Sequence, residues 1–133
     1  MRTLGQQRSE FALREVTSVF DKMKEKKDRE DFEAFAAGLP AMILKNGMGH
    51  TLAYCLAKGR DKHTKMIELV RRWLSYSNGK DIKNEFVENT RDGKDLVTKL
   101  SIMDQQPYFN AQNETLKLLE WVKRYANAFA KGD

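Results

Sequence analysis

The sequence has few residues that could form disulfide bonds and no long apolar segment that could insert into a membrane. Its 133 residues include one cysteine, Cys55, so an intramolecular disulfide is excluded. No uninterrupted apolar run approaches the ~20 residues that a membrane-spanning helix needs, and the stretch from Met1 to Arg14 is too polar for a signal peptide. We therefore expect a protein that is neither secreted nor embedded in a membrane, and a reducing cytoplasm suits its lone thiol.

Strand-forming patterns are also scarce. Runs of alternating valine, isoleucine and threonine are absent, while alanine, leucine, lysine, glutamate and methionine are plentiful. With 41% hydrophobic and 32% charged residues and only two prolines, the composition is typical of a folded helical protein. The length suits one domain with its own core. We predict an all-α fold, a compact single-domain bundle of about six helices spanning residues 1–133.

Catalytic and metal-binding motifs are missing. The chain has no His-Glu-x-x-His, no paired cysteines, no P-loop and no serine elbow. Neither His50 nor His63 has a second ligand at a metal-binding interval, and His50 lies at a poor helical spacing from Cys55. We predict a protein that is not an enzyme and holds no metal or cofactor. We interpret His63 as a surface or boundary residue and Cys55 as a small buried one.

Apolar residues recur at helical spacing along most of the chain. Asp28 and Asp61 are predicted N-caps, and Asn78-Gly79 is a predicted helix stop. Pro40 either kinks a helix or begins a new one after Gly38, and the sequence leaves both alternatives open. Pro107 interrupts the pattern before the last helix. The predicted helices cover about 7–26, 28–46, 51–58, 61–74, 94–104 and 110–131, with a loop at 89–93 and a shorter helix that residues 81–88 could form.

The passage from Leu39 to Tyr54 is the least ordinary, because a helix-ending signal, Asn46-Gly47, interrupts an apolar run. A second helix should begin almost at once. Its first amides lack intrahelical partners and carry the positive end of the helix dipole, so an anion could bind there. Lys45 and His50 would add donors to a phosphate. In the alternative interpretation, the glycines serve backbone geometry alone.

Basic residues outnumber acidic ones, 24 against 19, and the formal charge of +5 favours polyanionic partners. Lys65 and Arg72 lie two turns apart on one flank of the helix predicted over 61–74. Lys117, Arg124 and Lys131 recur at intervals of seven, so they drift by only ~20° per step and rise by ~10 Å. Such a row could follow a phosphate backbone, although an ordinary solvated face would look the same.

Two stretches resemble a known family. Residues 39–54 read Leu-Pro, two residues, Ile, two residues, Asn-Gly-Met-Gly, then Thr-Leu-Ala-Tyr, and the last helix contains Glu-Trp-Val-Lys-Arg-Tyr-Ala at 120–126. Both resemble the small helical subunit of type III-B CRISPR effector complexes, the Cmr type. Met48, His50 and Tyr54 stand where leucine, glutamine and phenylalanine are more usual, and they keep size and polarity. Residues from about 78 to 106 carry no such motif.

The resemblance implies a non-catalytic subunit in antiviral defence, stacked in a cytoplasmic filament alongside a guide RNA and its target RNA. Its partners would be copies of itself, the backbone subunits and the large subunit. Contacts to backbone phosphates would carry no sequence specificity. Charge placement, and not the resemblance, selects the RNA-binding candidates, which are Lys45, His50, Lys65, Arg72, Lys117, Arg124 and Lys131.

Two other hypotheses remain open. A protein-interaction module without nucleic acid would dock a partner through aromatic residues at helix ends or loops, namely Tyr76, Tyr108 and Phe109. A helix-turn-helix DNA reader would use the corner at Asn46-Gly47. The second is weaker, because residues 51–57 are apolar where a recognition helix presents polar side chains to base edges.

Overall fold

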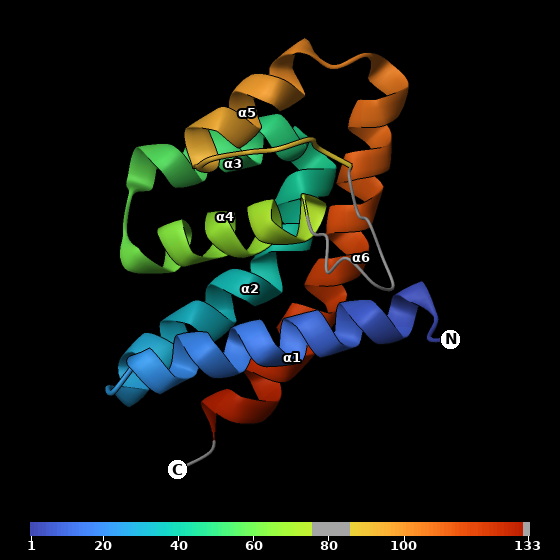
Figure 1. The fold of residues 1–133 in the computed structure, drawn as a ribbon. Coiled ribbons are helices and arrows are strands. Elements are labelled where there is room, and N and C mark those ends of the chain that lie inside the picture. The colour runs from blue at the N-terminus through green and yellow to red at the C-terminus, as the bar shows by residue number, and fades with distance from the viewer. Residues whose placement is uncertain (76–85, 132–133) are drawn as a thin grey trace. The chain divides into compact units, whose positions relative to one another are not determined.

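The computed structural model describes residues 1–75 and 86–131. These ranges contain helices and no strand, which confirms the predicted all-α fold (Figure 1). In chain order the helices are α1 (Leu4–Lys22), α2 (Lys26–Asn46), α3 (Met48–Lys58), α4 (Asp61–Leu74), α5 (Gly93–Ile102) and α6 (Gln105–Ala130). Most of the helix predicted at 81–88, the stop at Asn78-Gly79 and Tyr76 lie outside the described residues, and residues 86–88 are not helical.

The chain divides into two compact units. Unit 1 comprises Met1–Ala41 and Leu116–Asp133, and unit 2 comprises Met42–Thr115. Unit 1 therefore holds α1, most of α2 and the C-terminal part of α6, whereas unit 2 holds α3, α4 and α5 with the adjoining ends of α2 and α6. The single domain over residues 1–133 stays a prediction.

In unit 1, α1 begins at a capping box. The Thr3 side chain accepts a hydrogen bond from the Gln6 amide, and the Gln6 side chain accepts one from the Thr3 amide. The helix thus starts three residues before the predicted position. Its apolar face, with Val16 and Phe20, is buried, and the Phe20 ring meets the edge of Phe32 from α2 at 5.7 Å.

Helix α2 runs without interruption from Lys26 to Asn46 and contains Pro40 in its interior. The structure therefore selects the single continuous helix over a new helix begun by Pro40. Proline lacks the amide hydrogen that would bond the carbonyl four residues earlier, so this turn has lost one helical bond. Asp28 lies in the first turn of α2, so its prediction as the N-cap was wrong, although its charge still suits the helix dipole.

In unit 2, α3 packs against α4 and α5. The apolar residues that recur at helical spacing along α4 are all buried: Met66, Ile67, Leu69, Val70, Trp73 and Leu74. Gly59 closes α3 in the left-handed conformation, with φ of 61°. Asp61 is the first residue of α4 and Arg60 occupies the N-cap position, so the prediction of Asp61 as a cap was wrong.

The chain after α4 returns directly to the end of that helix. The amides of Phe86 and Val87 both donate to the carbonyl oxygen of Leu74, at 3.0 and 3.2 Å. The Ser75 hydroxyl donates to the carbonyl oxygen of Val87. The residues on either side of 76–85 are therefore held together by hydrogen bonds.

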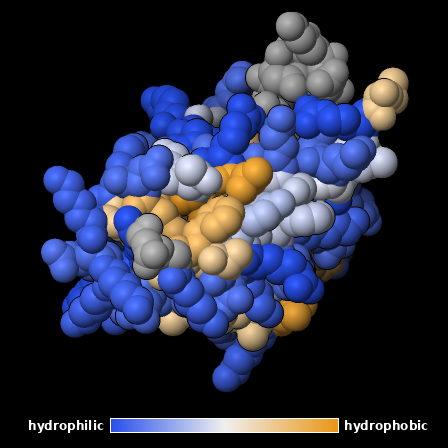
Figure 2. All heavy atoms as spheres, turned by 90° about the horizontal axis from the view of Figure 1, so that it is seen from below, coloured by the Kyte–Doolittle hydropathy of each residue, from blue (hydrophilic) through white to orange (hydrophobic). Residues whose placement is uncertain are grey.

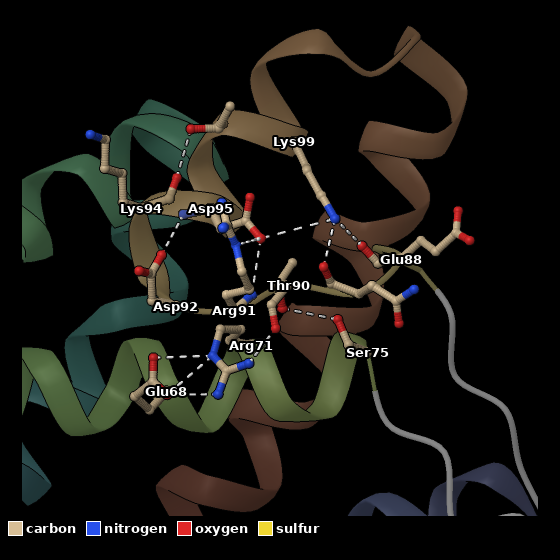
Figure 3. A network of polar contacts seen from close by, with 12 residues as sticks. Glu68, Arg71, Ser75, Glu88, Thr90, Arg91, Asp92, Lys94, Asp95 and Lys99 are labelled. Carbon is tan, nitrogen blue, oxygen red and sulfur yellow. Dashed lines mark hydrogen bonds and ion pairs between the residues drawn. The ribbon is translucent and has the colours of Figure 1, made fainter.

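Polar side chains then fix the predicted loop before α5 (Figure 3). The Arg71 guanidinium donates to the carbonyl oxygen of Thr90 at 2.7 Å. The Lys99 ammonium donates to the carbonyl oxygens of Glu88 and Asn89, each at 2.6 Å. Both cations thus satisfy backbone oxygens that no secondary structure would satisfy.

Helix α6 begins at Gln105, five residues before the predicted start, and Pro107 lies in its first turn. The first amides of a helix have no intrahelical acceptor, so a proline costs little there. The interpretation of Pro107 as a break was therefore wrong.

Candidate nucleic-acid interface

The basic stripe predicted on the last helix consists of Lys117, Arg124 and Lys131, all in unit 1. All three side chains are exposed. Lys117 and Arg124 lie on α6, and Lys131 follows directly after its last residue, Ala130. Seven-residue spacing keeps positions on one flank of a helix, with a drift of only ~20° per step. The stripe therefore offers cations at intervals of ~10 Å along α6.

Beside this stripe lies a row of aromatic residues. Trp121, Tyr125 and Phe129 occupy successive turns of α6, and each is only partly buried. Adjacent rings lie nearly parallel, with centroids 6.0 Å apart for Trp121 and Tyr125 and 5.8 Å apart for Tyr125 and Phe129. The four-residue spacing was visible in the sequence, but the partial exposure was not. We call these three residues the aromatic row.

A hydrogen bond fixes the middle ring of the row to α1. The hydroxyl oxygens of Tyr125 and Ser9 lie 2.6 Å apart. Ser9, Gly5 and Leu13 occupy successive turns of α1, and Leu13 is 39% exposed. The same face of α1 joins Trp121 in lining a hollow of about 590 Å³ within unit 1. No sequence pattern indicated this pairing of α1 with α6.

The corner between α2 and α3 differs from the predicted anion site. Gly47 takes φ of 87°, a conformation that other residues rarely adopt, which confirms the helix stop. The Met48 amide donates to the side-chain oxygen of Gln112 at 2.9 Å, and the Gly49 amide donates to the Tyr108 hydroxyl at 2.8 Å. Side chains of α6 in unit 2 therefore already satisfy two of the amides that we expected an anion to use.

Lys45 and His50 flank this corner and are both exposed, so their predicted contact with phosphate does not depend on those amides. On α4, Arg72 is exposed, whereas the Lys65 ammonium lies 3.5 Å from the Asp61 carboxylate with its side chain 25% exposed. All four belong to unit 2, unlike the α6 stripe. Lys65 would have to exchange its carboxylate partner for a phosphate.

The aromatic residues proposed for protein docking have different environments. The Tyr108 hydroxyl accepts a hydrogen bond from the Gly49 amide, and its ring meets that of Phe109 edge-on, with centroids 5.9 Å apart. Phe109 itself is 43% exposed. Of the two that the structure describes, Phe109 is thus the better candidate for contact with a partner.

His63 is buried, so its prediction as a surface or boundary residue was wrong. Its ring meets the edge of Tyr54, with centroids 5.9 Å apart. Burial lowers the pKa of His63, and the nearby charges of Lys62, Arg60 and Lys58 lower it further. The imidazole is therefore neutral at pH 7 and packs as part of the α3–α4 interface.

Cys55 is buried as predicted, and burial raises its pKa to about 11. Within the described ranges, no three His, Cys, Asp or Glu residues converge as a metal site would require. Helices able to cross a bilayer are also absent from the described part of the chain.

The raised pKa predicts slow thiol chemistry at Cys55. At pH 8 only about one thiol in a thousand would be ionised, and the thiolate is the reactive form. The native protein should therefore react with Ellman's reagent far more slowly than the protein in 6 M guanidinium chloride. Between pH 8 and 10 the native rate should rise about tenfold per pH unit, as measured by absorbance at 412 nm. Equal rates for native and unfolded protein at pH 8 would contradict the burial of this thiol.

The raised pKa of Cys55 also predicts how the stability of the folded protein depends on pH. The pKa in the folded protein, about 11, exceeds the ordinary value of 9.0. The unfolded chain therefore releases the thiol proton first as the pH rises. The contribution of Cys55 to stability is complete below about pH 9 and is lost as the pH approaches 11.

Comparison with known proteins agrees with the resemblance noted in the sequence. The model of a family described as CRISPR-associated protein (Cas_Cmr5) matches residues 4–129. A relative from Thermotoga maritima, named CRISPR system Cmr subunit Cmr5, is 26% identical over 100% of this chain and 89% of its own length. The crystal structure of a CRISPR-associated Cmr5 family protein from Thermus thermophilus has the same fold. Its TM-score is 0.73 and its identity 22%, over 96% of this chain and 97% of that chain. The family match spans α1 to α6, and the chain therefore belongs to the Cmr5 family of CRISPR-associated proteins.

Proposed function

We propose that this chain is a non-catalytic subunit of a cytoplasmic, type III-B RNA-guided Cmr effector complex in antiviral defence. In this proposal it stacks with copies of itself and with the backbone and large subunits, alongside the guide RNA and the target RNA. Family membership supports the complex, and the Thermotoga maritima relative is named as one of its subunits. The α6 stripe supports the contact with RNA.

The proposed contact with RNA rests on one observation, the basic stripe on α6. Its three cations are exposed: Lys117 and Arg124 share one flank of α6, and Lys131 follows directly after its end. Backbone phosphates are bound by such arrays without base readout. Glu120 follows Lys117 by three residues and precedes Arg124 by four, so its carboxylate is a neighbour of both cations and competes with a phosphate for them. The unit 2 candidates, Lys45, His50, Lys65 and Arg72, are a second group for the same role.

Replacing Lys117, Arg124 and Lys131 together with alanine should weaken binding to single-stranded RNA and flatten its salt dependence. Each phosphate contact on a single strand contributes about 0.7 to the slope of log affinity against log salt, so three lost contacts should reduce the slope by about 2. Fluorescence anisotropy with a labelled RNA, titrated at several KCl concentrations, measures both quantities.

A matched control removes the same charge elsewhere. Lys24 lies between α1 and α2, and Lys26 and Lys27 are the first two residues of α2; all three are exposed and belong to unit 1. Their triple alanine variant changes the net charge by the same three units but leaves the stripe intact. If both triple variants titrate alike, net charge alone governs binding and the stripe is not an RNA contact. If the unaltered chain binds no RNA, the interaction-module hypothesis replaces this one, with Phe109 as its first test.

A further inference from the structure

The aromatic row adjoins the basic stripe on α6, and each of its rings is partly exposed. Figure 2, which views the molecule from below, shows apolar and near-neutral residues gathered within a hydrophilic surround. In unit 1 the three residues of the aromatic row are partly exposed, and Leu13 is 39% exposed. Within the row, Tyr125 has ring neighbours on both sides, whereas Trp121 at one end has a ring neighbour on one side only, among the described residues.

Trp121 also lines the hollow that it shares with residues of α1. Its lining combines the indole with the small and apolar residues Gly5 and Leu13, the polar residues Thr3, Gln6 and Ser9, and the ion pair of Arg2 with Glu10. Its volume is about 590 Å³, and it is widely open to solvent. Planar ligands with hydrogen-bonding edges suit such a lining, because the indole offers a face and the α1 residues offer polar atoms.

Charge identifies the kind of molecule that carries this planar group. Lys117 precedes Trp121 by four residues and Arg124 follows it by three, so both cations are its neighbours on the helix surface. A ligand that occupies the hollow therefore places its linked groups over two exposed cations. Single-stranded nucleic acids have this combination of anionic backbone and unpaired planar bases, and proteins bind them by pairing aromatic residues with a basic track.

We propose that Trp121 and the adjoining hollow form a base-stacking subsite for single-stranded RNA. The base lies against the indole face, and the flanking phosphates reach Lys117 and Arg124. This inference rests on the proposed function, because it requires an RNA backbone on the α6 stripe. It adds contact with the bases themselves, which the stripe alone does not provide.

Tryptophan emission separates base stacking from phosphate contact in the unaltered chain. Trp73 is fully buried, so a stacked base should quench the emission of Trp121 alone. A twelve-residue oligouridylate should quench the emission excited at 295 nm, whereas an abasic ribose-phosphate oligomer of equal length should bind with similar salt dependence and leave the emission unchanged. The uridine oligomer should bind about 5- to 150-fold more tightly, the range expected for one stacked base.

Two variants localise the effect. Trp121→Phe retains only the emission of Trp73 and should show no quenching by either oligomer. Trp121→Ala, with its fold checked by circular dichroism, should bind the two oligomers with equal affinity. Both predictions distinguish stacking at Trp121 from a general change of the protein.

The possible failures are distinct. If both oligomers bind the unaltered chain equally and neither quenches Trp121, the stripe is an RNA contact but the stacking subsite is refuted. If neither oligomer binds at any salt concentration, the proposed function fails and this inference fails with it. Emission that changes with protein concentration but not with RNA would assign the face to a protein partner and overturn the proposal.

Discussion

Replacing Trp73 with alanine should lower the free energy of unfolding by about 3–5 kcal/mol, the usual cost of removing a buried tryptophan side chain. Trp73 is fully buried on α4 in unit 2. Its indole nitrogen also donates to the Glu114 carboxylate at 2.8 Å, and Glu114 is 4% exposed. The substitution therefore opens a cavity and removes a donor from a buried acidic group, two effects with the same sign.

Urea unfolding followed by circular dichroism at 222 nm measures this loss. Trp73→Phe separates the two effects, because it keeps most of the ring but removes the donor, and it should cost about 1–3 kcal/mol. Trp121→Ala is the matched control, since the same change at a partly exposed ring should cost less. A loss below about 1 kcal/mol for Trp73→Ala would mean that this residue does not hold the core of unit 2 together.

Adding a single methyl group at Gly93 should also be strongly destabilising, by about 1–3 kcal/mol. Gly93 is the first residue of α5 and is buried. A β-carbon built there would lie 2.7 Å from a methyl carbon of Ile67 and 3.2 Å from one of Leu56. Ile67 is itself only 3% exposed, so α5 would have to move away from α3 and α4. Chemical denaturation of Gly93→Ala measures this effect.

Gly38 provides a control of opposite sign. It lies in the interior of α2, it is exposed, and no atom lies within 4 Å of the place where a β-carbon would stand. Gly38→Ala should therefore stabilise the protein by about 0.5–1 kcal/mol, because alanine loses less backbone entropy in a helix. If Gly93→Ala leaves the free energy of unfolding unchanged or raises it, then α5 does not lie as close to Ile67 as the structure shows.

The sequence predicted those structural features that depend only on residues close together in the chain. The end of α2 follows from Asn46-Gly47, because Gly47 adopts a backbone conformation that side chains disfavour. The core face of α4 follows from apolar residues at helical spacing, as Met66 and Val70 show. The stripe was found in the same way, since seven-residue spacing alone places Lys117 and Arg124 on one flank.

Helical spacing and helix-ending residues do not predict contacts between residues that are far apart in the sequence. The sequence indicated that the amides of Met48 and Gly49 lack helical partners, but their acceptors, Gln112 and Tyr108, lie 64 and 59 residues further along the chain. Burial of His63 likewise follows from the packing of α4 against α3 and not from its local sequence.

The hollow beside Trp121 was missed for the same reason. Helical spacing places Trp121 next to Lys117 and Arg124 but says nothing of what faces its ring. The opposite wall comes from Ser9 and Leu13 of α1, more than a hundred residues away, and only their packing against α6 creates the space. A site built from two helices cannot be read from the periodicity of either one.

The hydrogen bonds from Phe86 and Val87 to Leu74 have a consequence for engineering. They make the points where the chain leaves α4 and returns to it immediate neighbours, whatever number of residues connects them. Doubling the length of a connection between fixed ends costs only about 0.6 kcal/mol. We therefore expect that a reporter peptide inserted between Ser75 and Phe86 would leave the ends of the connection in place.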